Sequence, residues 1–176
     1  MQSDLTAEEQ LTWERMWNEL YDRYYRAYFE ELRAERLISI WNPVDTICRV
    51  LIACTASGSA ISGWALWQQE GFRSCWTVIA GITAFIAIGY SVIGISERYR
   101  EASVLHSDFS NLRMKLEEMR TKMSTMQYDS LSIYKHEFTK LIETYSDVVS
   151  RRKPSILISD SMETTLQVKL NKRLGL

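Results

Sequence analysis

Two long runs without a charged residue constrain this chain more than any other feature. No Asp, Glu, Lys or Arg occurs from Val50 to Gln69, nor from Ser74 to Ser96. A helix needs about 20 apolar residues to cross the hydrocarbon core of a membrane, which is about 30 Å thick. At about 1.5 Å per residue, the second run would reach about 34 Å as a helix. The two runs therefore predict an all-α membrane protein with two transmembrane helices.

The overall composition hides this signal. The 176 residues carry 21 basic and 22 acidic side chains, and the mean hydropathy is −0.20. Six of the seven glycines lie between Gly58 and Gly94, and glycine is more frequent in membrane helices than in soluble ones. The alternative is that both runs are buried in a soluble core. Helices in so small a domain need a polar face, and we therefore favour the membrane.

The order of charges predicts the topology of the two runs. The spans are expected at about residues 46–69 and 74–96, and their short connection makes a transmembrane hairpin over residues 43–97. Basic residues flank the hairpin on both long sides, whereas the turn offers only Arg73. By the positive-inside rule, both termini are expected in the cytoplasm. The first 40 residues are too charged for a signal peptide.

Residues 1–42 are predicted to form a cytoplasmic amphipathic helix. Thr6 and Glu9 match a capping box at its start. Apolar side chains then recur at helical spacing, most of them aromatic: Trp13, Trp17, Leu20, Tyr24 and Tyr28. This stripe either packs against other cytoplasmic helices, which we favour, or meets a partner or the membrane surface. Asn42 and Pro43 are expected to end this helix or to start the next one.

Residues 98–150 carry two seams of apolar residues with heptad spacing. The first predicts a coiled-coil contact that holds an oligomer together: Leu105, Phe109, Leu112, Leu116, Met119, Met123 and Met126. The second has a different phase: Leu131, Tyr134, Phe138, Leu141, Tyr145 and Val148. Residues 127–130 between them are either a stutter within one helix or a turn between two. The methionines either form an adaptable binding surface or fill the core, and we favour the core.

Residues 151–176 form a basic tail. It carries six basic and two acidic side chains, a net charge of +4. Apolar residues at every fourth position predict a short amphipathic helix: Met162, Leu166, Leu170 and Leu174. Such a helix would contact anionic lipid or the acidic helices of a neighbouring subunit. A flexible, solvated tail is an equally good interpretation.

Small and polar residues follow separate faces of the two runs. The small residues are expected to pack the hairpin, because they let helix backbones approach closely: Ala53, Ala56, Ala60, Gly63, Ala80 and Ala87. The polar residues form a stripe: Thr55, Ser59, Ser62, Gln69, Thr83 and Tyr90. In an oligomer this polar stripe either lines a water-filled pore or joins helices by hydrogen bonds, and we favour the second role for any one residue. Asp45 and Arg49 are spaced to pair at the cytoplasmic end, where a surface ion pair contributes little.

No arrangement typical of an enzyme occurs in the sequence. His106 and His136 lie 30 positions apart, and no Ser or Cys has a general base beside it. No metal-ligand spacing or phosphate-binding loop is present, so no metal and no cofactor are expected. The nearly balanced charge argues against nucleic acid as a partner. The cysteines, Cys48, Cys54 and Cys75, are expected to be reduced, because a hairpin separates the first from the third.

The order of parts is a charged helix, a hairpin and a long helix, with a junction that reads IAIGYSVIGISERYREASVLHSDFSNLRMKLEEM. This order and junction resemble the SLATT family, which comprises two-transmembrane effector domains associated with bacterial nucleotide-signalling conflict systems. The resemblance covers roughly residues 10–150 and rests on residue classes instead of a fixed motif. It implies an antiphage effector in the bacterial inner membrane, acting beside a separate sensor protein or a nucleotide second messenger.

Two functions follow as hypotheses. The first is an oligomeric inner-membrane effector that forms a pore or disrupts the membrane when it is triggered, in abortive infection. The second is a non-conducting membrane anchor, or scaffold, whose cytoplasmic helical bundle recruits a partner protein. The two differ in one observable, since only the first predicts a membrane conductance.

Overall fold

A computed structural model describes residues 6–66, 70–126, 130–151 and 159–175, and only the backbone of residues 56–66, 70–73, 75 and 76. The regular structure of these residues is entirely helical, without a strand, as the sequence predicted. The described residues form five helices: α1 (Ala7–Leu66), α2 (Glu70–Ile93), α3 (Ile95–Ser124), α4 (Leu131–Ser150) and α5 (Asp160–Leu174). They form two compact units, which we call the bundle unit (Met1–Glu35 with Ser103–Leu176) and the hairpin unit (Arg36–Ala102).

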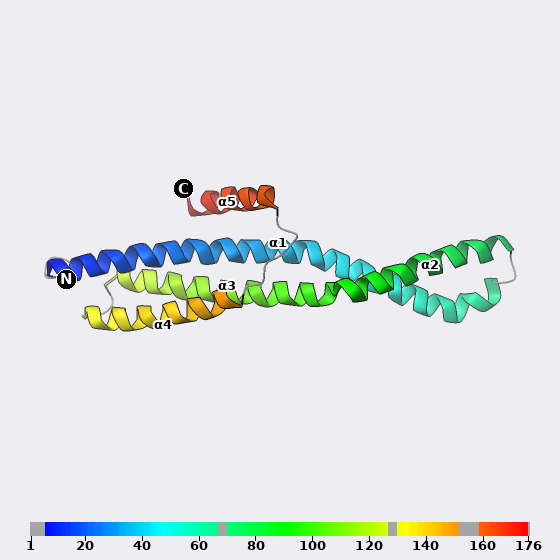
Figure 1. The fold of residues 1–176 in the computed structure, drawn as a ribbon, viewed down its shortest axis with the longest axis horizontal. Coiled ribbons are helices and arrows are strands. Elements are labelled where there is room, and N and C mark those ends of the chain that lie inside the picture. The colour runs from blue at the N-terminus through cyan, green and yellow to red at the C-terminus, as the bar shows by residue number, and fades with distance from the viewer. Residues whose placement is uncertain (1–5, 67–69, 127–129, 152–158, 176) are drawn as a thin grey trace. The chain divides into compact units, whose positions relative to one another are not determined.

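The bundle unit is built around one apolar core between α1, α3 and α4 (Figure 1). Both predicted seams supply this core, which is completed by α1: Met16, Leu20, Tyr24, Ala27, Phe109, Leu112, Leu116, Met119, Met123, Tyr134, Phe138, Leu141 and Val148. Trp13, Trp17 and Tyr28 pack against it. The aromatic stripe of the first helix therefore packs against neighbouring helices, and the methionines of the seam fill the core.

The predicted capping box begins α1. The Thr6 backbone N–H donates to the Glu9 carboxylate at 2.9 Å, and the Glu9 N–H donates to the Thr6 hydroxyl at 3.4 Å. These hydrogen bonds lower the pKa of Glu9 below its usual 4.5, the backbone bond from Thr6 having the largest effect. The box satisfies donors that the first turn of a helix leaves without an internal partner.

A turn, and not a stutter, separates the two heptad seams. α3 ends at Ser124, and Met126 has a positive φ of 50°, which breaks the helix. Ser130 then caps α4 by accepting a hydrogen bond from the Ser132 N–H. α4 returns along α3, where the Tyr134 hydroxyl donates to the Lys122 carbonyl at 3.1 Å. Residues 127–129 of the step lie outside the described residues.

The predicted tail helix is present and packs on the chain's own α1. Leu166 and Leu170 of α5 are buried against Leu32 of α1, in a cluster separate from the main core. Met162 and Leu174 pack at the edge of the same cluster. The tail is therefore not a flexible, solvated segment over these residues, because its helix is packed within the bundle unit.

The hairpin unit holds the second half of α1, all of α2 and the start of α3. The prediction that Pro43 ends the first helix is wrong, since α1 is continuous and carries Pro43 in its interior. A proline inside a helix costs about 3 kcal/mol. Leu37 and Asp45, on either side of Pro43, are both buried.

Gly94 separates α2 from α3. Its φ of +65° lies in the left-handed region, and the chain bends by 42° between Ile93 and Ile95. Residues with a side chain reach this conformation at a cost of about 1–2 kcal/mol, so glycine is suited to the position. The break lies two residues before the end of the predicted span, Ser96.

One helix of the described residues is by itself long and apolar enough to cross a membrane. It is α1, counted over Ala7–Thr55. The pair Thr77–Ile93 and Ile95–Ser124 meets the same length and composition test when the two helices are taken together.

Candidate functional site

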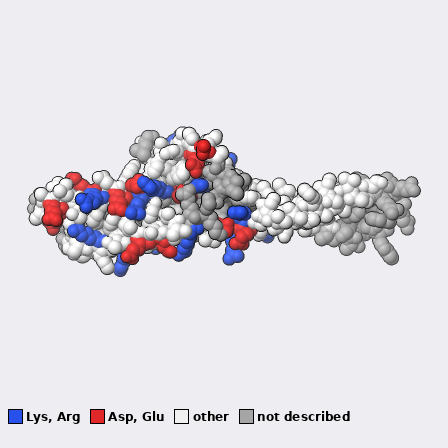
Figure 2. Space-filling view, viewed as in Figure 1, with Lys and Arg blue, Asp and Glu red and all other residues white. Residues whose placement is uncertain are grey.

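The described surface of α2 is unusual because it exposes many large apolar side chains. Large apolar side chains are exposed on it over about four turns: Val78, Ile79, Ile82, Phe85, Ile88, Val92 and Ile93. Phe85 and Val92 are each 80% exposed. Figure 2 shows Lys, Arg, Asp and Glu gathered over the bundle unit, whereas the described surface of α2 is white. A contiguous apolar surface of this kind is typical of membrane or partner contact.

The second half of α1 shows the same pattern near its start. Val44, Ile47, Val50 and Leu51 are exposed. The buried residues of this stretch include a charged one, because Asp45 is only 6% exposed. These surfaces of α1 and α2 are therefore apolar outside, and a carboxylate is buried between the two helices, unlike the usual arrangement in a water-soluble helix pair.

The buried Asp45 carboxylate belongs to a group of four residues in mutual contact. We call this group the basal cluster: Asp45, Arg49, Tyr90 and Ser96. The Tyr90 hydroxyl donates to Asp45 at 2.7 Å, and Arg49 Nε lies 3.0 Å from the same carboxylate. Arg49 also donates to the Tyr90 hydroxyl at 3.3 Å and to the Ser96 hydroxyl at 2.9 Å. These contacts join α1 to α2 and to the first turn of α3.

The basal cluster is more than the surface ion pair that the sequence suggested. A buried carboxylate is tolerated when it is paired and hydrogen-bonded, and Asp45 has both kinds of partner. Removing one partner would leave charge uncompensated, so the cluster fixes the register of α1 against α2. The i, i+4 spacing pointed to Asp45 and Arg49, but no sequence signal assigned Tyr90 or Ser96 to them.

The described members of the polar stripe do not form one continuous polar surface. Thr55 and Thr83 donate their hydroxyl hydrogens to carbonyls of their own helices, at Leu51 and Ile79. Thr83 is buried, whereas Tyr90 belongs to the basal cluster. The side chains of Ser59, Ser62 and Gln69 lie outside the described residues. The stripe is therefore in part a set of internally satisfied hydroxyls.

The described small residues are only partly buried by helix packing within the hairpin unit. Ala53 and Ala80 are exposed, and Ala87 is half-buried. Thr83 is the most buried of the described α2 side chains. The side chains of Ala56, Ala60 and Gly63 lie outside the described residues.

The predicted oligomer seam lies inside the bundle unit. Five of its members are buried against α1 and α4 of the same chain: Phe109, Leu112, Leu116, Met119 and Met123. Leu105 packs at the edge of this core. An oligomer held by this seam would require the bundle to open, and the oligomeric role stays a prediction.

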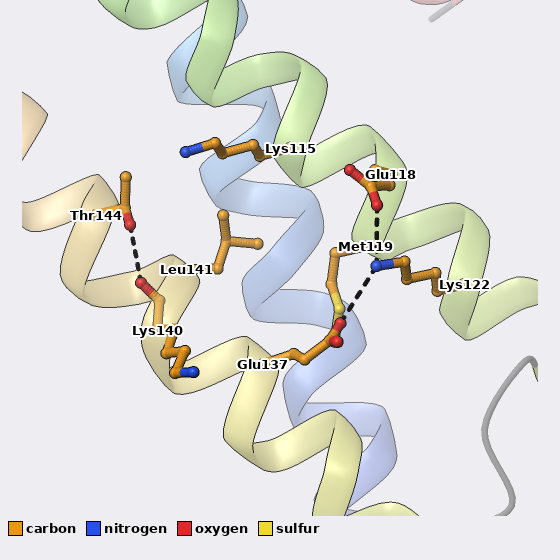
Figure 3. A pocket seen from close by; sticks show the side chains of 8 residues that line it. All are labelled: Lys115, Glu118, Met119, Lys122, Glu137, Lys140, Leu141 and Thr144. Atoms are coloured by element: carbon orange, nitrogen blue, oxygen red, sulfur yellow. Dashed lines mark hydrogen bonds and ion pairs between the residues drawn. The ribbon is translucent and has the colours of Figure 1, made fainter.

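Figure 3 shows a groove of about 310 Å³ between α3 and α4, with three lysines at its walls. The Lys122 ammonium forms ion pairs with two carboxylates, those of Glu118 at 2.9 Å and Glu137 at 3.4 Å. Lys115 and Lys140 have exposed side chains. The described residues contain no group of three or more His, Cys, Asp or Glu side chains placed to hold a metal.

Comparison with known proteins gives no relative. No protein-family model, no curated protein and no solved structure matches this chain.

Proposed function

We propose that this chain is an oligomeric effector of the bacterial inner membrane, which permeabilises the membrane when it is triggered. Its hairpin crosses the bilayer as two spans, about residues 46–69 and 74–96, and both termini lie in the cytoplasm. The likeness to SLATT domains supports a role in antiphage defence beside a separate sensor. The bundle unit holds the trigger-receiving surface.

The apolar surface of α2 carries the proposal. Leaving that surface in water would cost about 25 cal/mol for each Å² that lipid covers. α2 has 24 residues, enough to cross about 30 Å of hydrocarbon. Arg49 and the basal cluster lie at the cytoplasmic end of the spans, where an arginine side chain extends to the lipid headgroups.

The pore step is supported by the polar stripe and by the absence of charge from Val50 to Gln69 and from Ser74 to Ser96. A stripe without charge suits a wide, weakly selective path or one gated by dewetting. Several hairpins are needed to enclose such a path, since two helices surround no lumen. The oligomer is therefore part of the proposal.

A second function, a non-conducting membrane anchor, is favoured by the bundle core. The seam that was expected to join subunits is occupied within one chain. A monomeric hairpin with a closed bundle would hold a partner protein at the membrane without conducting ions.

Planar-bilayer conductance of the purified full chain, together with its detergent-corrected mass, separates the two functions. The effector gives current steps and a mass of several chains. The anchor gives a monomeric mass and no current at any protein concentration. A current that persists after Phe85→Lys, which opposes insertion, would show that the hairpin is not its source.

A further inference from the structure

A cavity of about 480 Å³ lies in the bundle unit between the start of α1 and the end of α3, which run side by side in Figure 1. Two indoles, two thioethers and one carboxylate stand in its walls: Trp13, Trp17, Met123, Met126 and Glu14. We call it the indole cavity. Sites for small molecules have volumes of about 300–1,000 Å³, so the cavity is large enough to hold one.

The two indoles of this cavity are held in place by the core of the bundle unit. Trp13 and Trp17 lie one turn apart on α1, are half-buried and pack against the main core. Trp13 meets the ring of Tyr134 edge to face, with the ring centroids 5.0 Å apart. Tyr134 is itself fully buried. The indoles are therefore positioned before a ligand arrives, which lowers the entropic cost of binding one.

Aromatic rings elsewhere in the bundle unit already have a cation of this chain over them. The guanidinium of Arg113 lies 5.0 Å from the ring centre of Tyr28, and that of Arg120 lies 5.0 Å from that of Tyr24. An indole attracts a cation more strongly than a phenol ring does. Within the described residues, no arginine or lysine lies over either indole of the cavity. The best cation-binding rings of the bundle unit thus line a cavity.

The charge around the indole cavity is negative. Glu14 is exposed at its rim and forms no salt bridge with another described residue. Residues 7–19 of α1 carry four acidic side chains and one basic side chain. The groove between α3 and α4 in Figure 3 differs, because three lysines stand at its walls. A carboxylate beside aromatic rings favours a cationic ligand over an anionic one.

The methionines of the cavity distinguish an organic cation from a metal ion. Met123 is only 1% exposed and Met126 is half-buried, so both offer thioether surface beside the indoles. Such side chains adapt to apolar groups. Calcium and magnesium ions instead need several oxygen ligands, and the cavity lining offers one carboxylate. The lining therefore suits an ammonium group that carries alkyl substituents.

We propose that the indole cavity binds an organic cation with an alkylated ammonium group, recognised by Trp13, Trp17 and Glu14. The two indoles attract the charge through their ring faces, Glu14 supplies the opposite charge, and the methionines contact the alkyl groups. The site belongs to the bundle unit, so the inference does not depend on whether the chain crosses a membrane. If the wild-type chain fails to float with vesicles, the membrane effector is wrong and this binding site still stands.

The test compares two probes of nearly the same shape on the full chain in a non-ionic detergent. Choline carries a quaternary nitrogen, and 3,3-dimethylbutan-1-ol has a carbon atom in its place. Isothermal titration at matched sodium chloride concentration gives both affinities. Choline is expected to bind about tenfold tighter, because two contacts with indole faces each favour the charge. Equal affinities would overturn cation recognition, and an absence of choline binding would overturn the site.

Variants of the cavity then locate the bound cation. Glu14→Gln is expected to weaken choline binding about threefold, whereas Glu8→Gln, at an exposed position outside the lining, leaves it unchanged. Trp17→Leu should weaken it about fivefold, with Trp17→Phe in between, because phenylalanine keeps a ring with a weaker attraction for cations. Circular dichroism checks that each variant is folded. Choline binding that is unchanged in both Glu14→Gln and Trp17→Phe would place the cation elsewhere and contradict the proposal.

Discussion

The bundle unit and the hairpin unit are built from parts of the same helices with opposite polarity. In the bundle unit, Leu20, Leu112 and Leu116 are inside, and charged side chains lie on the surface, although Glu30 and Arg33 are buried. In the hairpin unit, Phe85 and Val92 are outside and Asp45 is inside. The contrast is the one expected if, as proposed, water surrounds the first unit and lipid the second.

The largest effect is expected from a charge on the exposed face of α2. A lysine near the centre of a transmembrane helix costs about 2.5–3.5 kcal/mol, so Phe85→Lys should lower membrane insertion roughly a hundredfold. Val104→Lys is the matched control, because Val104 is 54% exposed and belongs to the bundle unit. Flotation with vesicles measures both. Equal flotation of the two variants would remove the distinction between the units.

The next prediction concerns a cavity in the core of the bundle unit and its effect on the free energy of unfolding. Leu116 is fully buried, and Leu116→Ala should reduce the free energy of unfolding by about 2–5 kcal/mol, because it leaves a cavity. Met114→Ala, at a position that is 51% exposed, should change it by less than about 0.5 kcal/mol. Urea titration followed by circular dichroism gives both values. A charge here, Leu112→Asp or Leu116→Asp, should unfold the bundle before it changes any oligomer.

The third prediction concerns the loss of stability when a hydrogen bond of the basal cluster is removed. Tyr90→Phe removes one donor from the buried Asp45 carboxylate, and the expected loss is about 1–3 kcal/mol. Tyr21→Phe, at an exposed position of α1, is the control. Thermal unfolding in detergent compares the two proteins. If both tyrosines tolerate the change equally, the cluster does not hold the register of the hairpin unit.

Gly94→Ala should destabilise by about 1–2 kcal/mol, because alanine is strained at a positive φ. Gly81→Ala provides the contrast within α2. A Cβ at Gly81 meets no atom within 4 Å, so alanine there should be neutral or stabilising by up to about 1 kcal/mol. Opposite signs in thermal unfolding are expected. The same sign at both positions would contradict the bend at Gly94.

The smallest effect concerns the first turn of α1. The pKa of Glu9 is lowered by hydrogen bonds from Thr6, so the capping box contributes its stability above the usual pKa of 4.5. That contribution is lost as the pH falls through the lowered pKa. The protection of the first-turn amides, relative to that of core amides, should therefore fall at acidic pH in the wild type and less so in Glu9→Gln. Core amides of the bundle unit serve as the internal reference.

The sequence predicted the local features of the bundle unit well. The capping box, both heptad seams, the tail helix and the helical class are present in the structure. Each depends on residues within a few turns of one another. Such features follow directly from spacing and residue type.

The features that the sequence did not predict all depend on distant partners. A heptad seam specifies a buried face without specifying which chain covers it, and here α1 and α4 of the same chain do. Tyr90 and Ser96 joined Asp45 and Arg49 only through the fold. Pro43 lies inside a continuous helix, against its local propensity, with Leu37 and Asp45 buried on either side. Leu166 and Leu170 found Leu32 across most of the chain length.

Alkaline carbonate washing of vesicles that contain the wild-type chain tests the central claim most directly. If lipid surrounds the apolar surface of α2, the chain stays in the pelleted membranes, because burial of that surface does not depend on charge. Its release into the supernatant would show that α2 is covered by protein and not by lipid.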